Sequence, residues 1–130
     1  AAPDVRCFRD PTRGGLASTL NELAAQANVD ITIDESAVPV LDAVRGACEM
    51  LGYDVMQVAN EGKMVCVVPA AQAQAALDAM RASTYGENAA IIGEVTSSTE
   101  GRGNKVFLRT AFGSTRVLDM LVGEQLPRIC

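Results

Sequence analysis

The sequence predicts an α/β domain in which a mixed sheet is flanked by helices, and three observations lead to that prediction. The chain has 130 residues, enough for one domain that buries its own core. Segments with helical and with strand-like apolar spacing alternate along it. The last third carries three short strand patterns separated by glycine-containing turns.

A helix is predicted over about residues 12–27 and a strand over 29–34. Asp10 suits the helix cap and Pro11 the first helical position. The inward face of the helix would consist of Leu16, Leu20, Leu23 and Ala27. Apolar and polar residues then alternate through 29–34, which is typical of a half-buried strand.

The middle of the chain predicts a second helix, which begins after Pro39. Gly46 is expected to interrupt or kink it, and Gly52 to end it. Its inward face would consist of Val40, Val44, Ala47 and Leu51. The uninterrupted apolar run 64–68 then predicts a strand covered on both faces.

The last third predicts an alanine-rich helix over 70–82 and three further strands. The residues expected to face inward on this helix are Ala73, Ala76, Leu77 and Met80. The strands are expected at 90–96, 105–109 and 115–118, joined as two hairpins. Residues 121–130 show neither spacing, so we expect a domain over 1–120 followed by a mobile tail.

The charge balance argues against two classes of partner. The 11 Lys and Arg residues and 16 Asp and Glu residues give a net charge of −5, and histidine is absent. Such a chain does not neutralise a row of phosphates, so neither nucleic acid nor an anionic membrane is expected as a partner. No apolar run reaches the roughly 18 to 20 residues that span a bilayer, which predicts a soluble protein.

The four cysteines are Cys7, Cys48, Cys66 and Cys130. Because no C-x-x-C pair and no histidine occur, no metal site is expected. Cys48 and Cys66 lie in apolar patterns typical of reduced thiols, which favours a cytoplasmic location. At Cys130 the adjacent α-carboxylate disfavours the thiolate, so reactivity there requires docking against positive charge; a terminal cysteine without a role is the ordinary alternative.

Adjacent glycines in a first helical turn cost helix stability, so Gly14 and Gly15 call for a reason. One reason is a ligand: phosphate or carboxylate would reach the N–H groups of the helix start, beside Thr12 and Arg13. The other reason is tight packing of the helix start against the sheet. The spacing alone leaves both open.

Glu61 lies in a turn between Asn60 and Gly62, and a solvated surface carboxylate is its ordinary interpretation. It also precedes an apolar strand, and α/β folds gather reactive groups at sheet ends. Lys63 would project to the same side as Glu61 if this segment is extended, which would place a carboxylate and a cation near one another.

Four segments of the chain, in order, resemble the HypE family of hydrogenase maturation factors. They are Arg-Asp-Pro-Thr-Arg-Gly-Gly at 9–15, Ala-Asn-Glu-Gly-Lys at 59–63, Ala-Ile-Ile-Gly-Glu-Val at 90–95 and Leu-Pro-Arg-Ile-Cys at 126–130. The first is shared in looser form across the aminoimidazole ribonucleotide synthetase superfamily, whereas the ending is close to diagnostic for HypE. The resemblance covers nearly all of the chain and corresponds to the C-terminal half of the family, without the N-terminal ATP-binding domain.

The resemblance implies an ATP-dependent carbamoyl dehydratase that supplies the cyanide ligands of [NiFe] hydrogenase. The carbamoyltransferase HypF would load a carbamoyl group onto Cys130, dehydration would give a thiocyanate, and the cyano group would pass to iron on the HypC–HypD complex. ATP with Mg²⁺ would be bound mainly by the missing half, so this fragment is expected to hold no cofactor and to be inactive alone. The full-length protein is expected to be a homodimer.

Mapped onto this chain, the resemblance makes Cys130 the carrier and Glu61, with Lys63, the candidate proton-transfer group. The residues that would border the reaction cleft are Asp10, Thr12, Arg13, Gly14, Gly15 and Asn60. The family often has a histidine shortly before its first motif, and residues 4–8 of this chain contain none. A superfamily enzyme acting on a free small molecule, and a non-catalytic partner-binding module, are the two alternatives.

Overall fold

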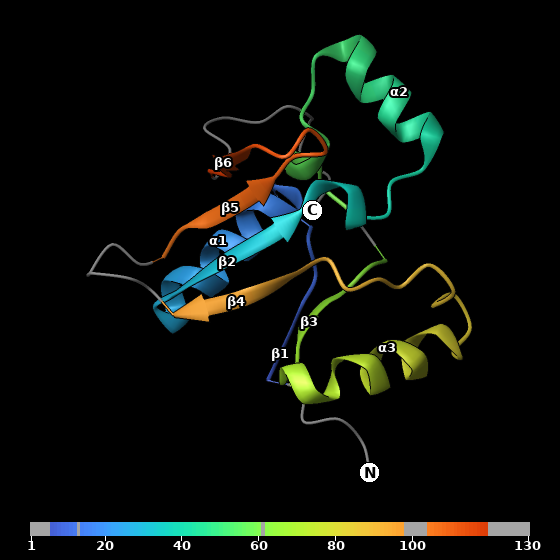
Figure 1. The fold of residues 1–130 in the computed structure, drawn as a ribbon. Helices are drawn as coiled ribbons and strands as arrows, with labels where there is room; N and C mark the ends of the chain where they lie inside the picture. Colours follow the sequence, from blue (N-terminus) through green and yellow to red (C-terminus); the bar gives the residue numbers. More distant parts are fainter. Residues whose placement is uncertain (1–5, 13, 61, 98–103, 120–130) are drawn as a thin grey trace.

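The computed structural model describes residues 6–12, 14–60, 62–97 and 104–119 and confirms the mixed α/β class (Figure 1). Its helices are α1 (Gly15–Ala27), α2 (Asp42–Leu51) and α3 (Ala73–Arg81). Its strands are β1 (Cys7–Arg9), β2 (Val29–Asp34), β3 (Val65–Val67), β4 (Gly93–Ser97), β5 (Val106–Arg109) and β6 (Thr115–Val117). Short 3₁₀ turns occur at η1 (Glu35–Ala37), η2 (Val55–Gln57) and η3 (Ala70–Gln72).

The main sheet has the strand order β4-β2-β5-β6. Strand β2 pairs antiparallel with β4 and parallel with β5, and β5 and β6 form an antiparallel hairpin. The predicted hairpin between β5 and β6 is therefore confirmed, whereas the predicted hairpin between β4 and β5 is wrong. The reason is that β2, whose Ile31 and Ile33 are buried, lies between these two strands and pairs with both.

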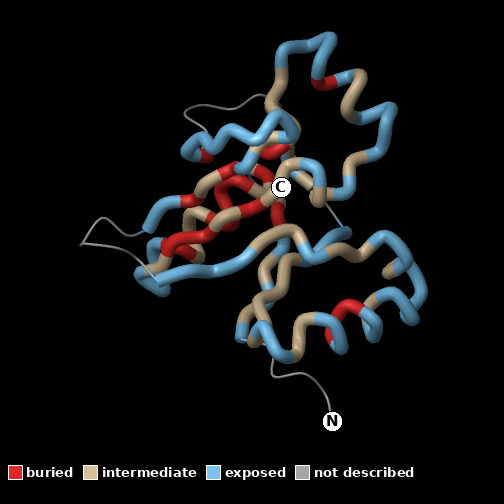
Figure 2. The backbone as a smooth tube through the Cα atoms, in the orientation of Figure 1, coloured by how far each residue is buried: buried red, intermediate tan, exposed pale blue. Residues whose placement is uncertain are grey.

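The core lies between the main sheet and α1, which packs against β2 and β5 (Figures 1 and 2). Its fully buried residues include Ala17, Ile33, Val106, Leu108 and Leu118. Within α1 the predicted face is partly displaced: Leu20 is buried, Leu16 and Leu23 pack at the margin, and Ala27 is exposed. Small alanines at the centre of the face bring the helix backbone close to the sheet.

A second sheet consists of β1 and β3 only, and β1 is a strand that the sequence patterns missed. The apolar run 64–68 does form the strand β3, but the prediction that both faces are covered is wrong. On one face of the small sheet, Val65 packs against the core. On the other face, which carries the pair Phe8 and Cys66, Phe8 is 55% exposed. An ion pair between Arg9 and Glu22 links β1 to α1.

Helix α2 differs from its prediction in two respects. It runs without interruption through Gly46, where an added Cβ would meet nothing within 4 Å, and it ends at Gly52 as expected. The predicted inward face is wrong, because Leu51 is 63% exposed and the only buried residue of α2 is Cys48. The helix packs against η2 rather than against the sheet, so most of its surface faces solvent (Figure 2).

Helix α3 matches its prediction more closely. Residues 70–72 are a 3₁₀ turn, the α-helix covers 73–81, and Ala76 and Leu77 are buried as expected. Within the described ranges, no helix has the length and apolar character needed to cross a membrane.

Candidate functional site

The segment before α1 is a tight turn rather than a first helical turn. The helix begins at Gly15, and Gly14 and Gly15 have φ angles of +70° and +64°, in the left-handed region that favours glycine. The predicted cap at Asp10 and helical position at Pro11 are therefore wrong. The carbonyl of Asp10 instead accepts a hydrogen bond from the Thr19 hydroxyl at 3.4 Å, and no side chain caps α1.

Positive φ angles favour glycine at both positions, and close packing against backbone adds a second reason at Gly15. A Cβ on Gly15 would lie 2.4 Å from the carbonyl oxygen of Val58, and one on Gly14 would lie 1.9 Å from Oγ of Ser18. The structural reason that the sequence left open therefore applies at Gly15, although its neighbour is the η2 segment and not the sheet. A ligand at the helix start remains compatible with this packing, because Thr12 and Gly14 are only half-buried.

The two motif segments lie side by side. The backbone N–H of Asn60 donates a hydrogen bond to the carbonyl oxygen of Pro11 at 3.0 Å, which joins the turn before α1 to the segment after η2. The helix start and η2 are also in direct contact. The structure thus brings together Asp10, Thr12, Gly14, Gly15 and Asn60 in one region.

Three of the candidate residues, Arg13, Glu61 and Cys130, lie outside the described residues. Lys63 is described and exposed. Gly62, immediately before it, has a φ angle of +74°, so the backbone is not extended there. The condition for placing Lys63 and Glu61 on one side is therefore not met. The strand that follows these residues is β3, which belongs to the small sheet. The segment is therefore not at an end of the main sheet.

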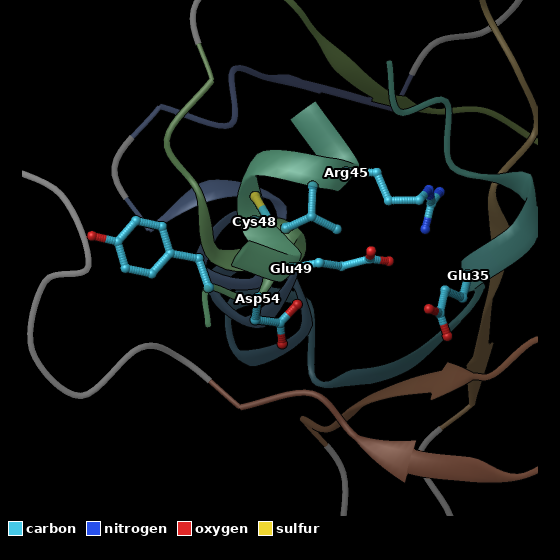
Figure 3. A pocket seen from close by; sticks show the side chains of 7 residues that line it. Glu35, Arg45, Cys48, Glu49 and Asp54 are labelled. Carbon is cyan, nitrogen blue, oxygen red and sulfur yellow. The ribbon is translucent and has the colours of Figure 1, made fainter. Parts of the chain in front are cut away.

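A pocket of about 170 Å³ lies between η1, α2 and η2 (Figure 3). Its lining residues are Glu35, Arg45, Cys48, Glu49, Tyr53, Asp54 and Val55. The sequence patterns missed it, because charged residues on an exposed helix are usually a solvated face. The one available signal was the i, i+4 spacing of Arg45 and Glu49, which places both on one side of α2.

The described thiols are free. Burial, with a smaller contribution from Cys7, raises the pKa of the Cys66 thiol, which therefore stays protonated at neutral pH. The strand register places Cys7 opposite Val67 and Cys66 opposite Phe8, so the two thiols face opposite sides of the small sheet. Among the described residues, no group of three His, Cys, Asp or Glu side chains is arranged to hold a metal ion.

Substituting Gly15 by alanine is expected to lower the unfolding free energy of the intact protein by about 2 kcal/mol or more. The added Cβ would combine backbone strain at a positive φ with overlap against the η2 backbone. Urea denaturation measures this change.

Gly46→Ala is the matched control, because that site is helical and open. It is expected to raise the unfolding free energy by about 0.5 to 1 kcal/mol. An equal effect of the two substitutions would contradict the packing described for Gly15.

Comparison with known proteins agrees with this architecture. Residues 1–105 match the family described as AIR synthase related protein, C-terminal domain. The carbamoyl dehydratase HypE of Azotobacter vinelandii is 52% identical over 130 residues, which is 100% of this chain and 37% of that protein. The chain therefore spans little more than a third of the length of this relative.

Two solved structures are similar over most of the chain. A crystal structure of the hydrogenase maturation protein HypE in complex with ATP has a TM-score of 0.90 and 49% identity, over 98% of this chain and 38% of that one. A crystal structure of a HypE–HypF complex has a TM-score of 0.83 and 41% identity, over 90% of this chain and 37% of that one. The turn before α1, the mixed sheet and these matches together show that the chain belongs to the family of AIR synthase related protein C-terminal domains.

Proposed function

We propose that the chain is the C-terminal part of an ATP-dependent carbamoyl dehydratase that makes the cyanide ligands of [NiFe] hydrogenase. Cys130 carries a carbamoyl group as a thiocarbamate, and dehydration converts that group to a thiocyanate. The observation that carries the proposal is the hydrogen bond between Asn60 and Pro11, which holds the two motif segments of the HypE resemblance together. The high identity to a protein named carbamoyl dehydratase supports the same conclusion.

The chemistry of the dehydration assigns a role to each segment. Bound ATP supplies the phosphoryl group that makes the carboxamide oxygen a leaving group. The oxygen then departs with phosphate, and the nitrogen loses both of its protons. Glu61 is the candidate base for one of them. Lys63 is exposed and acts, in this proposal, through its charge.

The segment before α1 would border the phosphate groups. At the start of α1 the helix dipole favours an anion, and Arg13 adds a positive charge. Asp10, Thr12 and Asn60 complete this edge. Most of the nucleotide and its Mg²⁺ would be held by residues outside this chain, so the fragment alone would not turn over ATP.

The partners follow from the same scheme. HypF loads Cys130, the HypC–HypD complex receives the cyano group, and a homodimer is the expected state of the full-length protein. Residues 121–130 serve as the carrier arm of the domain formed by residues 1–120. The free thiols of Cys7, Cys48 and Cys66 support a cytoplasmic location, because reducing conditions preserve them.

Deleting residues 126–130 from the full-length protein tests the carrier scheme as a whole. The truncated protein should acquire no carbamoyl group when incubated with HypF, carbamoyl phosphate and ATP, as judged by its intact mass. An enzyme that acts on a free small molecule would keep its activity after this deletion. Retained activity would therefore favour that alternative over a protein-borne substrate.

A further inference from the structure

The pocket beside α2 has an excess of negative charge. The carboxylate of Glu49 points into the space between the Arg45 guanidinium and the Glu35 carboxylate, which come from α2 and η1 (Figure 3). Among the described residues, neither Glu35 nor Glu49 forms an ion pair. Two carboxylates therefore face one guanidinium, and a second cation would balance them.

Two arginines of the main sheet are already engaged in ion pairs. Arg116 on β6 pairs with Asp54 at 3.2 Å, and Arg109 on β5 pairs with Asp34 at 3.1 Å. Within the described part of the chain, no further cation lines the pocket. A further cation at the pocket would therefore come from outside the described residues or from a ligand.

The chain itself leaves the described region beside this pocket. The carbonyl oxygen of Asp119 accepts a hydrogen bond from Nε2 of Gln57 at 3.3 Å, and Gln57 ends η2, whose first residue, Val55, lines the pocket. Arg128 follows Asp119 by nine residues, a length that spans up to about 30 Å when extended. Because Asp119 contacts η2, an element that lines the pocket, this length lets Arg128 return to the pocket, and a short connection keeps the effective concentration high.

We propose that Arg128 docks in this pocket, between Glu35 and Glu49. Guanidinium suits the site because its planar fork binds carboxylates well. Leu41 lies one helical turn before Arg45 and is 68% exposed, so it offers an apolar contact for Ile129, which follows Arg128. Cys130 is then held against α2 and partly shielded from solvent.

Docking of Arg128 gives the terminal thiol a resting position on its own domain. That role rests on the proposed function, because only a carrier thiol needs to be protected between transfers. The contact between Arg128 and the pocket does not depend on the proposed function, because it is inferred from charge and chain length. Its strength is modest, as for an exposed ion pair, which lets a partner or active site displace it.

The test measures how fast iodoacetamide alkylates Cys130 in the reduced full-length protein, followed by peptide mass mapping. Protection is the alkylation rate of a free peptide with the same residues 120–130 divided by the alkylation rate of the protein. This ratio removes the direct effect of residue 128 on the reactivity of the thiol. The variants are Glu49→Arg, Arg128→Glu and the double charge swap. Glu87→Arg, on an exposed loop, is the control with the same charge change.

The wild-type protein and Glu87→Arg are expected to show about threefold protection of Cys130. Each single variant at the pocket or tail should reduce the protection to none, and the charge swap should restore it. Protection that survives Glu49→Arg would overturn the proposal, as would protection that depends on protein concentration and so comes from a second copy. No HypF is needed, so failure of the carrier function and failure of docking are separate results.

Discussion

Replacing Cys130 by alanine in the full-length protein is expected to reduce carbamoyl transfer from HypF to background. In the proposed reaction the sulfur is the atom that forms the bond to the carbamoyl carbon, and alanine has no nucleophile. The measurement is the intact mass after incubation with HypF, carbamoyl phosphate and ATP. Cys130→Ser should behave in the same way, because an unactivated hydroxyl is a far weaker nucleophile than a thiolate.

Cys66→Ala is the matched control for this result. Burial raises the pKa of the Cys66 thiol and keeps it protonated at neutral pH, so its removal should leave the transfer unchanged. A carbamoyl group found on the Cys130→Ala protein would show that the carrier is elsewhere. Full function of Cys130→Ser would instead favour a tail that only docks on a partner.

The second large effect is expected at Glu61. Glutamine keeps the size of the side chain and removes the proton acceptor, so Glu61→Gln should still be carbamoylated but should dehydrate about 10²- to 10⁴-fold more slowly. Mass analysis after addition of ATP would show the thiocarbamate persisting. Glu87→Gln, which changes an exposed glutamate of the α3–β4 loop, should leave both steps at wild-type rates. Normal thiocyanate formation by Glu61→Gln would remove Glu61 from the mechanism.

Sequence patterns identified the elements that form the core. Strand β2 was predictable because its apolar and polar residues alternate, and Ile31 and Ile33 are indeed buried. Most of α1 was predictable from its helical spacing, but its start was not. Gly15 lies against the η2 segment, some 40 residues further along the chain, and local patterns do not contain that contact.

Sequence patterns could not predict the strand pairing or the exposed face of α2 either, because both depend on contacts between distant segments. Nothing local to β4 or β5 shows that β2 separates them, because the pairing depends on how α1 and the core arrange the sheet. The spacing of Val44 and Leu51 predicted a buried face, yet both residues are exposed and α2 packs mainly against η2 among the described elements. Helical spacing gives a candidate face, and tertiary packing decides whether it is covered.

The candidate site divides in a similar way. The motif residues around Thr12 and Asn60 could be found in the sequence, because their types and order resemble one family. Their proximity could not, since it depends on the backbone hydrogen bond from Asn60 to Pro11. The pocket of Glu35 and Glu49 could not be found either, because these residues come from two elements, η1 and α2. The residue spacing within each element does not predict that the two elements lie side by side.

The central position of β2 has a consequence for how the chain acquires its structure. Ile31 pairs with Val106, 75 residues later, and its other neighbour, Val95, is also distant along the chain. During synthesis the backbone N–H and C=O groups of β2 therefore remain without strand partners until β4 and β5 have left the ribosome. Closing such long loops costs chain entropy before any pairing is gained, and high contact order slows folding. We infer that the hairpin of β5 and β6 forms as an early local unit and that its docking onto β2 limits the folding rate.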